Sequence, residues 1–302
     1  MNHQNKSDRA GAGGNSGALF VVGTPLGNLE DMTLRAIRTL REVDLVAAED
    51  TRRTAKLLAH LQIQKPTVSY YHHNEQGRTE DLIARLTAGT HIALVTDAGM
   101  PGISDPGAIL IAAALAANIP VIPIPGPTAA TTALVISGLP TDRYVFEGFL
   151  PRSGKPRKAR LVELAAETRT IVLYEAPHRL IRTLNDLYDQ LGERPVAVAR
   201  ELTKVHEECI RGTLCEVIAH FTAHPPRGEF VVVLAGKKAQ GEEQEWGEDG
   251  ERQLPALLRA ALQAGLSRPD AVKAVMKQTG LPRREVYQAS LSLDASNEDS
   301  EK

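Results

Sequence analysis

Residues 91–107 read HIALVTDAGMPGISDPG and decide the fold that the rest of the chain adopts. The apolar run 92–96 predicts a buried strand, and the acid Asp97 follows it directly. The loop behind it contains three glycines and two prolines, so it presents backbone more than side chains. An apolar helical pattern begins near Ile109. A strand, a glycine-rich loop and a helix in this order predict a parallel sheet with a small ligand at the carboxyl end of the strand.

The charge around this loop narrows the kind of ligand. No lysine or arginine occurs between Arg85 and Arg143, whereas Asp97, Asp105 and Asp142 lie in that span. A phosphate site would need the opposite charge, because anions are held by cations and by backbone amides. The loop is therefore predicted to bind a neutral or cationic ligand.

Length and composition indicate an ordinary globular protein of two compact domains with appendages. The chain has 302 residues, of which 42% are hydrophobic and 24% charged. A formal net charge of -2 excludes a strong overall field for nucleic acids, so such contacts would need local patches. The cysteines, Cys209 and Cys215, lack metal-ligand spacing, and we expect free thiols and no metal. No run reaches membrane-spanning length and the amino end does not resemble a signal peptide, so we expect a cytoplasmic protein without a membrane contact.

The first half of the chain alternates apolar runs with helical patterns, which predicts a parallel sheet covered by helices. Asp31 is the predicted N-cap of the first helix, and a further helix should begin at Pro106. The predicted strands of this half are 19–23, 45–48, 67–70, 92–96 and 120–124.

The second half alternates less regularly, and its short connections predict a mixed sheet. Its predicted strands are 143–147, 170–175, 195–201, 206–211 and 229–235, with helices at 158–166, 177–190 and 214–221. The predicted fold class is α/β with two domains, one with a parallel and one with a mixed sheet, followed by a helical unit resembling a helix-turn-helix. The expected boundaries are a disordered tail 1–18, domains 19–140 and 141–236, an acidic linker 237–252, the helical unit 253–291 and a tail 292–302.

Three loops of the first domain are predicted to meet at one edge of its sheet. Pro25, the residues 97–100, and the pair Thr128 and Ala129 all follow predicted strands. Ligands of open parallel sheets bind at that edge, so we expect the three loops to form one ligand site. Residues 23–28 lack the GxGxxG spacing of a dinucleotide site, and the chain contains no GxxxxGK[ST] phosphate loop.

A cluster of cations forms the counterpart of the acidic loop. Five lysines and arginines fall within the nine residues 152–160, with glycine and proline among them. We predict a mobile loop here in which Arg152, Lys155, Arg157 and Lys158 can bind phosphates, although the composition alone slightly favours a solvated charged surface. Arg52 and Arg53 follow another strand and are predicted to extend this surface, the alternative being ion pairs along a helix.

At this point the motifs carry a resemblance to a known family. Taken together they resemble the tetrapyrrole methylase superfamily and, more narrowly, its branch that methylates the ribose 2'-hydroxyl of a cytidine in small-subunit (16S) ribosomal RNA. Met100 departs from the pattern, since threonine is common there, and a backbone contact would survive the change. The motifs span about residues 19–236 and are found at 22–29, 48–52, 73–75, 96–107, 125–127, 146–151, 174–179, 199–204 and 228–232.

The resemblance implies S-adenosylmethionine as cofactor, a cofactor site in the cleft between the two domains, and a homodimer. It also implies small-subunit ribosomal RNA, or the small ribosomal subunit, as the partner. Beside a methyltransferase cleft, RNA binding becomes the preferred role of the cations at 152–158 and of Arg52 and Arg53. By motif position, the implied cofactor contacts are Pro25, Asp97, Gly99, Met100, Thr128, Ala129, Tyr174 and Glu229.

Methyl transfer to a ribose hydroxyl would benefit from a nearby base, because that hydroxyl is poorly acidic. We select Asp50 and Glu201 as catalytic candidates from the wider set Glu49, Asp50, His73, Glu75, Glu201, Lys204 and His206. Two other functions stay open at this stage. One is methylation of a tetrapyrrole carbon, which would not need the cationic segment, and the other is a nonenzymatic nucleic-acid-binding regulator that uses the terminal helices.

Overall fold

A computed structural model describes residues 16–237, 248–279 and 286–291, and the chain divides into two compact units, 1–237 and 238–302. Residues 1–15 of the tail predicted at 1–18, most of the linker predicted at 237–252 and the tail predicted at 292–302 lie outside the described residues. In the described part of the chain, no helix is long and apolar enough to cross a membrane. Within the same residues, no group of three or more His, Cys, Asp or Glu side chains is placed to hold a metal ion.

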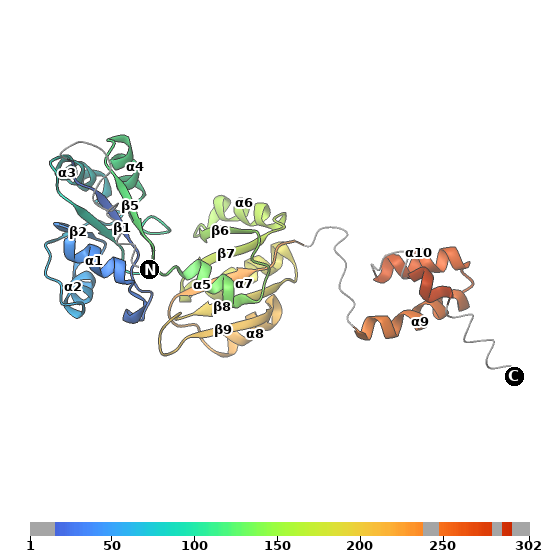
Figure 1. Ribbon diagram of the computed structural model, residues 1–302. Helices are drawn as coiled ribbons and strands as arrows, with labels where there is room; N and C mark the ends of the chain where they lie inside the picture. The colour runs from blue at the N-terminus through green and yellow to red at the C-terminus, as the bar shows by residue number, and fades with distance from the viewer. Residues whose placement is uncertain (1–15, 238–247, 280–285, 292–302) are drawn as a thin grey trace, which may run out of the picture. The chain divides into compact units, whose positions relative to one another are not determined.

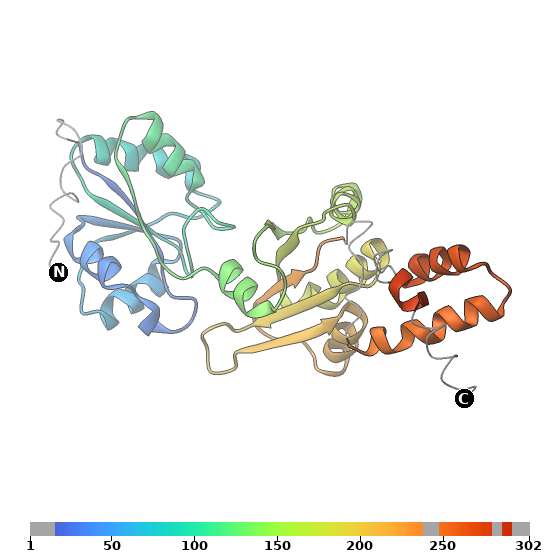
Figure 2. The same cartoon turned by 45° about the vertical axis from the view of Figure 1, so that its right-hand side comes forward.

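The first half of unit 1 is a parallel five-stranded sheet, as predicted, with the strand order β3-β2-β4-β1-β5. Helices α1 and α2 cover one face, and helices α3 and α4 cover the other (Figures 1 and 2). The elements are β1 (Leu19–Val22), α1 (Leu34–Glu42), β2 (Leu45–Ala48), α2 (Thr51–His60), β3 (Thr67–Ser69), α3 (Glu75–Thr87), β4 (Ile92–Val95), α4 (Ala108–Ala116) and β5 (Val121–Ile124).

Apolar side chains bury both faces of the central strands, which explains their continuous apolar runs. Along β4, Ala93 and Val95 pack under α1 and α2, whereas Ile92 and Leu94 pack under α3 and α4. The prediction of Asp31 as a helix N-cap is wrong. Asp31 ends a short 3-10 helix, and the hydroxyl of Thr33 caps α1 by accepting the Ala36 N–H at 3.1 Å.

The helix predicted from Pro106 begins two residues later, at Ala108, because Gly107 has a positive φ of 139°. The first amide groups of α4 are bound by side chains of the neighbouring segment 70–75. The carboxylate of Glu75 accepts the Gly107 N–H at 3.0 Å, and the hydroxyl of Tyr70 accepts the Leu110 N–H at 3.1 Å. Glu75 is thus a buried cap for a helix that follows it by more than thirty residues.

The second sheet is mixed, as predicted, with the order β6-β7-β10-β8-β9. β6 and β7 are parallel, and the other neighbours are antiparallel. Helices α6, α7 and α8 contribute to its larger core. The elements are β6 (Tyr144–Phe149), α6 (Gly154–Ala165), β7 (Thr170–Glu175), α7 (Pro177–Leu191), β8 (Pro195–Arg200), β9 (Glu208–Thr213), α8 (Leu214–Ala223) and β10 (Phe230–Leu234).

Helix α5 (Ala129–Ser137) belongs to the second core, although its sequence lies within the predicted first domain. Its residues Ala130, Ala133 and Leu134 pack against Val172 and Val231 of the second sheet. The chain therefore passes from the first sheet to the second before residue 129, not at residue 140.

Unit 2 contains α9 (Glu248–Gln263), α10 (Arg268–Thr279) and a helical segment at 286–291. Leu254, Leu258, Val272, Val275 and Val286 form its core. Helix α9 begins inside the predicted acidic linker. The turn between α10 and the last helical segment lies outside the described residues, so the helix-turn-helix geometry stays a prediction.

A glycine pair beside the first sheet generates a stability prediction. A Cβ atom at Gly126 would lie 2.8 Å from the Cα of Gly23, whereas a Cβ at Gly77 in α3 would meet nothing within 4 Å. We expect Gly126→Ala to lower the free energy of unfolding by about 2 kcal/mol, because backbone must move. Gly77→Ala should instead raise it by up to about 1 kcal/mol, because alanine favours a helix. Urea denaturation measures both, and equal effects would contradict the crowding.

Candidate functional site

The three predicted ligand loops do meet at the carboxyl edge of the first sheet, because β1 lies between β4 and β5. Two backbone hydrogen bonds join the first two loops: Thr24 N–H to Gly99 O at 2.9 Å, and Gly99 N–H to Thr24 O at 3.0 Å. The Thr24 hydroxyl adds a bond to Thr96 O at 2.9 Å. The third loop touches the first where the backbone of Gly126 lies against the backbone of Gly23.

The residues of this edge offer mostly backbone to a ligand. Gly99 is buried with a φ of 83°, a conformation that glycine adopts without strain. The side chain of Met100 approaches Gly23, with its sulfur 2.7 Å from the place of a Cβ there. Thr128 is the N-cap residue of α5, and Ala129 is the first residue of that helix. Pro25, Asp97, Gly99, Met100, Thr128 and Ala129 thus lie on three joined loops.

Three other predicted residues come together at one edge of the second sheet. Strand β10 pairs Phe230 with Glu175 on one side and with Arg200 on the other, so Tyr174, Glu201 and Glu229 lie near the same end. The Tyr174 hydroxyl accepts the Ala130 N–H at 3.2 Å and so ties this edge to the first turn of α5. Burial raises the pKa of Tyr174, which keeps its phenol protonated.

The loop after β8 touches the loop after β1. Thr203 Oγ1 accepts the Asn28 N–H at 3.1 Å, and the Lys204 side chain covers Gly27. Glu201 and Thr203 have positive φ values of 50° and 67°, which are unusual for residues other than glycine. Strain of this kind is found where surrounding contacts demand it, often at functional sites.

Asp97 lies at the centre of a charged network. Its carboxylate is 3.1 Å from the Arg53 guanidinium and accepts the Asp50 N–H at 3.2 Å, while its own N–H donates to Glu49 at 3.1 Å. Burial raises the pKa of Glu49. The prediction that no cation lies near Asp97 is therefore wrong. Helix α2 brings Arg53, which lies 44 residues earlier in the chain, into contact with this acid.

The two acids selected as catalytic candidates occupy different environments. Asp50 caps α2 by accepting the Arg52 N–H at 2.8 Å and also pairs with the Arg52 side chain. These hydrogen bonds lower the pKa of Asp50 to about 2. Glu201 is paired with Lys204 at 3.1 Å. Both acids thus lie at strand ends, and both carry a salt bridge.

Asp105 is an acid that the sequence argument did not select. Burial, followed by the charge of Glu49, raises the pKa of Asp105 to about 7, and the charges of Asp97 and Glu229 add to the effect. Its loop reaches the second sheet, where Ser104 Oγ lies 3.1 Å from the place of a Cβ at Gly148. No sequence signal distinguishes this carboxyl from Asp97, since only folding surrounds it with other acids.

The cationic segment is a helix and not a mobile loop, since α6 begins at Gly154. Arg157 is 3% exposed, donates to Thr183 Oγ1 at 2.9 Å and pairs with Asp186 at 2.7 Å. Its prediction as an RNA contact is therefore wrong, because its charge is used inside the fold. Arg160 pairs with Glu147 and Glu163. Arg152, Lys155 and Lys158 remain exposed.

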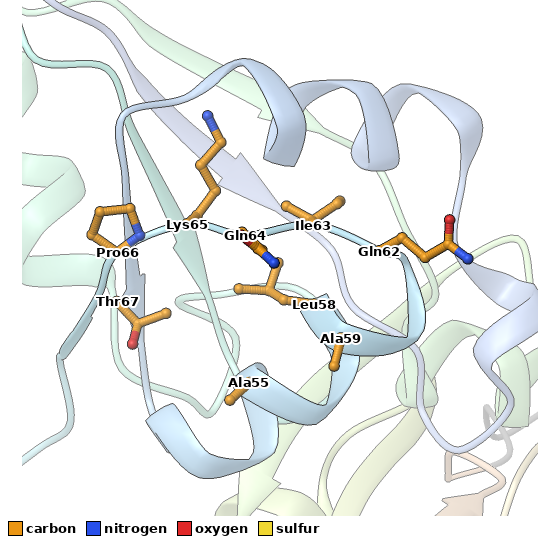
Figure 3. Close-up of a pocket in the computed structure, with 9 residues that line it drawn as sticks. All are labelled: Ala55, Leu58, Ala59, Gln62, Ile63, Gln64, Lys65, Pro66 and Thr67. Carbon is orange, nitrogen blue, oxygen red and sulfur yellow. The ribbon is translucent and has the colours of Figure 1, made fainter.

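A large open groove lies away from these loops. Figure 3 shows it between the end of α2 and the segment that leads into β3, lined by residues such as Leu58, Gln62 and Lys65. It opens where β3 begins, at Thr67, which is the opposite edge of the sheet from the joined loops. The groove is therefore separate from the candidate site.

Comparison with known proteins agrees with this architecture. Residues 18–218 match the family of Tetrapyrrole (Corrin/Porphyrin) Methylases. A protein of Synechocystis named Ribosomal RNA small subunit methyltransferase I is 55% identical over 280 residues, covering 92% of this chain and 99% of that protein. A protein of Thermotoga maritima with the same name is 49% identical over 222 residues, covering 74% of this chain and all of that protein.

Solved structures of lower identity share the fold. Uroporphyrin-III-C-methyltransferase from Thermus thermophilus is 24% identical with a TM-score of 0.51, and the match covers 72% of this chain and 94% of that one. The cobalamin biosynthetic enzyme cobalt precorrin-4 methyltransferase is 18% identical with a TM-score of 0.56 and the same coverages. A two-domain α/β fold with joined strand-end loops thus defines the class, and the chain belongs to the tetrapyrrole methylase family.

Asp105 generates a prediction on the pH dependence of stability. Its pKa is about 7 in the folded chain and ordinarily 3.8, so the native state holds the proton more tightly. The free energy of unfolding therefore falls as pH rises from about 4 to about 7. We expect Asp105→Asn to add about 1 kcal/mol or more at pH 8 and little at pH 4, since one pKa unit equals about 1.4 kcal/mol.

Thermal or urea unfolding at several pH values measures this difference. Asp142→Asn, at an exposed aspartate outside the site, serves as the matched control and should change stability equally at both pH values. A gain for Asp105→Asn that does not grow with pH would contradict the prediction.

Proposed function

We propose that this protein is an S-adenosylmethionine-dependent methyltransferase that methylates the ribose 2'-hydroxyl of a cytidine in small-subunit (16S) ribosomal RNA. The observation that carries the proposal is the joined set of loops at the first sheet, found in a chain whose near full-length relatives are named for small-subunit ribosomal RNA methylation. The acting partner is the RNA itself or the small ribosomal subunit, which places the enzyme in the cytoplasm.

The donor groups of the site fit a cofactor with a sulfonium, an adenosine and an amino acid. A structure of uroporphyrin-III C-methyl transferase holds S-adenyl homocysteine in the shared fold. In this chain, the carboxylate of Asp97 suits a ribose hydroxyl or an ammonium group, and the backbone of Gly99 and Met100 suits a flat base. Pro25, Thr128 and Ala129 complete the first edge, and Tyr174 and Glu229 contribute from the second. When bound, the cofactor would supply an electrophilic methyl group, because that methyl is bonded to a positively charged sulfur that leaves as a neutral thioether.

Most of the catalysis would come from positioning, because the ribose oxygen must lie in line behind the methyl carbon. Asp50 and Glu201 are proposed to assist loss of the hydroxyl proton. Asp50 is strongly ionised, which suits electrostatic support more than proton uptake. Asp105 is a third proposed acceptor, because an acid with a pKa of about 7 exchanges protons at physiological pH.

RNA is proposed to bind cations exposed near the two strand edges. Arg152, Lys155 and Lys158 lie on or beside α6, which follows β6 at the edge that carries Tyr174. Arg52 and Arg53 lie in the first turn of α2, with side chains 88% and 68% exposed. Phosphate contacts of this kind supply affinity but do not distinguish one RNA sequence from another. Other groups must therefore select the nucleotide.

A homodimer is proposed on the basis of α4, whose sequence AILIAAALA has no polar face. Ile109 is 43% exposed and Leu115 is 59% exposed, although a helix apolar on all sides is normally covered. A second copy of the chain is the partner that we propose for this surface.

The function is tested by incubating the protein with labelled S-adenosylmethionine and small ribosomal subunits that lack the modification. We expect label on a ribose of the small-subunit RNA, located by nuclease digestion and mass spectrometry. A parallel incubation with a tetrapyrrole precursor is the control. Label on the tetrapyrrole alone, or on an RNA base, would defeat the proposal.

The same assay tests the two acids. Asp50→Ala and Glu201→Ala should each lower turnover by about a hundredfold if they assist proton transfer, with little change in the cofactor Kd. Asp142→Ala is the control at an exposed site. Unchanged turnover in a folded variant removes that acid from the proposal.

The dimer is tested with Leu115→Glu, which would place a charge in the proposed interface. We expect at least a hundredfold weaker self-association, on the order of 3 kcal/mol, because an unpaired charge would be buried. Sedimentation measures the mass of the protein, and Thr222→Glu, at an exposed position of α8, is the matched control. A Leu115→Glu variant that remains dimeric would contradict this interface.

A further inference from the structure

A recess lies directly beside the joined loops, on the face of the sheet covered by α2. It has a volume of about 240 Å³ and is bounded by the loop 24–29 on one side and by residues 53–57 of α2 on the other. Because one water occupies about 30 Å³, the recess can hold a group of several heavy atoms. It is not the groove of Figure 3, which opens at the other edge of the same sheet.

Cations prevail in this recess. Arg53 and Lys56 line it, and Asp97 is the lining acid. Asp97 is already paired with Arg53, so the positive charge of Lys56 is left over. The other two cations of α2, Arg52 and Arg53, are each paired with an aspartate, which leaves Lys56 as the lysine or arginine of this helix without an acidic partner among the described residues. The recess therefore favours an anion, unlike the cation-free loop that was predicted from the sequence.

Lys56 is available to a ligand. Its side chain is exposed, and it makes no ion pair or hydrogen bond with any residue that the structure describes. Opposite it, the backbone N–H groups of Leu26 and Gly27 donate to no described residue either. Ammonium groups and backbone amide groups are the donors that phosphate oxygens prefer, and Lys56, Leu26 and Gly27 all line the recess.

We infer that this recess binds a phosphodiester of the RNA substrate, next to the ribose that receives the methyl group. The inference rests on the proposed function. A surface-bound polyanion fits because the cations stand at the mouth of the recess, where the Arg53 side chain is 68% exposed.

The recess also links RNA to the cofactor loop. Arg53 contacts Asp97 in the present structure, and the same guanidinium lines the recess. A phosphate in the recess would contact the same Arg53 guanidinium that contacts Asp97. A single side chain would therefore connect the phosphate with the cofactor loop. Lys56 does not contact Asp97, so it is the residue whose replacement separates the two sites.

The test compares Lys56→Ala with Lys65→Ala, a lysine on the same side of the sheet that lines the groove of Figure 3. Binding to undermodified small ribosomal subunits is measured by sedimentation over a range of salt concentrations, and cofactor binding is measured by calorimetry. We expect Lys56→Ala to weaken subunit binding about tenfold and to reduce the slope of log K against log salt by roughly 0.7–0.9. The cofactor affinity of Lys56→Ala should not differ from that of the wild-type protein. Lys56→Arg should retain most of the subunit binding, and Lys65→Ala should bind subunits like the wild-type protein.

Each contrary result has a distinct meaning. If Lys56→Ala and Lys65→Ala bind subunits equally, the recess holds no phosphodiester and the inference is wrong. If Lys56→Ala weakens cofactor binding and spares subunit binding, the anion is the carboxylate of the cofactor. If the unmodified protein binds no subunits, the proposed function itself fails together with the inference.

Discussion

The pair of backbone hydrogen bonds between Thr24 and Gly99 is the constraint on which the site depends. It exists because β1 lies beside β4, so that two loops far apart in the sequence leave the sheet as neighbours. The third loop joins the first separately, at Gly23 and Gly126, where a Cβ atom on Gly126 would lie 2.8 Å from the Cα of Gly23. A strand order and two glycines thus bring three loops together before any ligand is present.

Much of the first sheet could be predicted because its signals are local. Short apolar runs place its strands within one residue of their observed ends, and the carboxyl-edge rule then joins the loops. The capping of α1 was missed because Asp31 and Thr33 are both good cap residues two positions apart. Local signals could not decide between them.

Charge was harder to predict, because it depends on which side chains meet in space. Glu75 looked like a free acid in a loop, yet it caps a helix of the same domain. Arg157 looked like the middle of a cationic loop, yet it fills a buried position against Thr183 and Asp186. In both cases the partners lie at least 26 residues away in the sequence. Periodicity and composition carry no information about such partners.

Asp50 and Asp105 show how far folding separates residues of one type. The pKa of Asp50 is lowered to about 2 because Arg52 and an amide group bind its charged form, whereas the pKa of Asp105 is raised to about 7 because burial and other acids oppose its charge. This difference in pKa cannot be predicted from the residues next to either aspartate in the sequence. A base in this site is therefore best sought among the acids that have no arginine partner. Position at the end of a strand, which led to the selection of Asp50, is a poorer criterion. Asp105 has no arginine partner among the described residues, and its pKa is raised by burial and by other acids. Asp97, by contrast, is paired with Arg53 of α2.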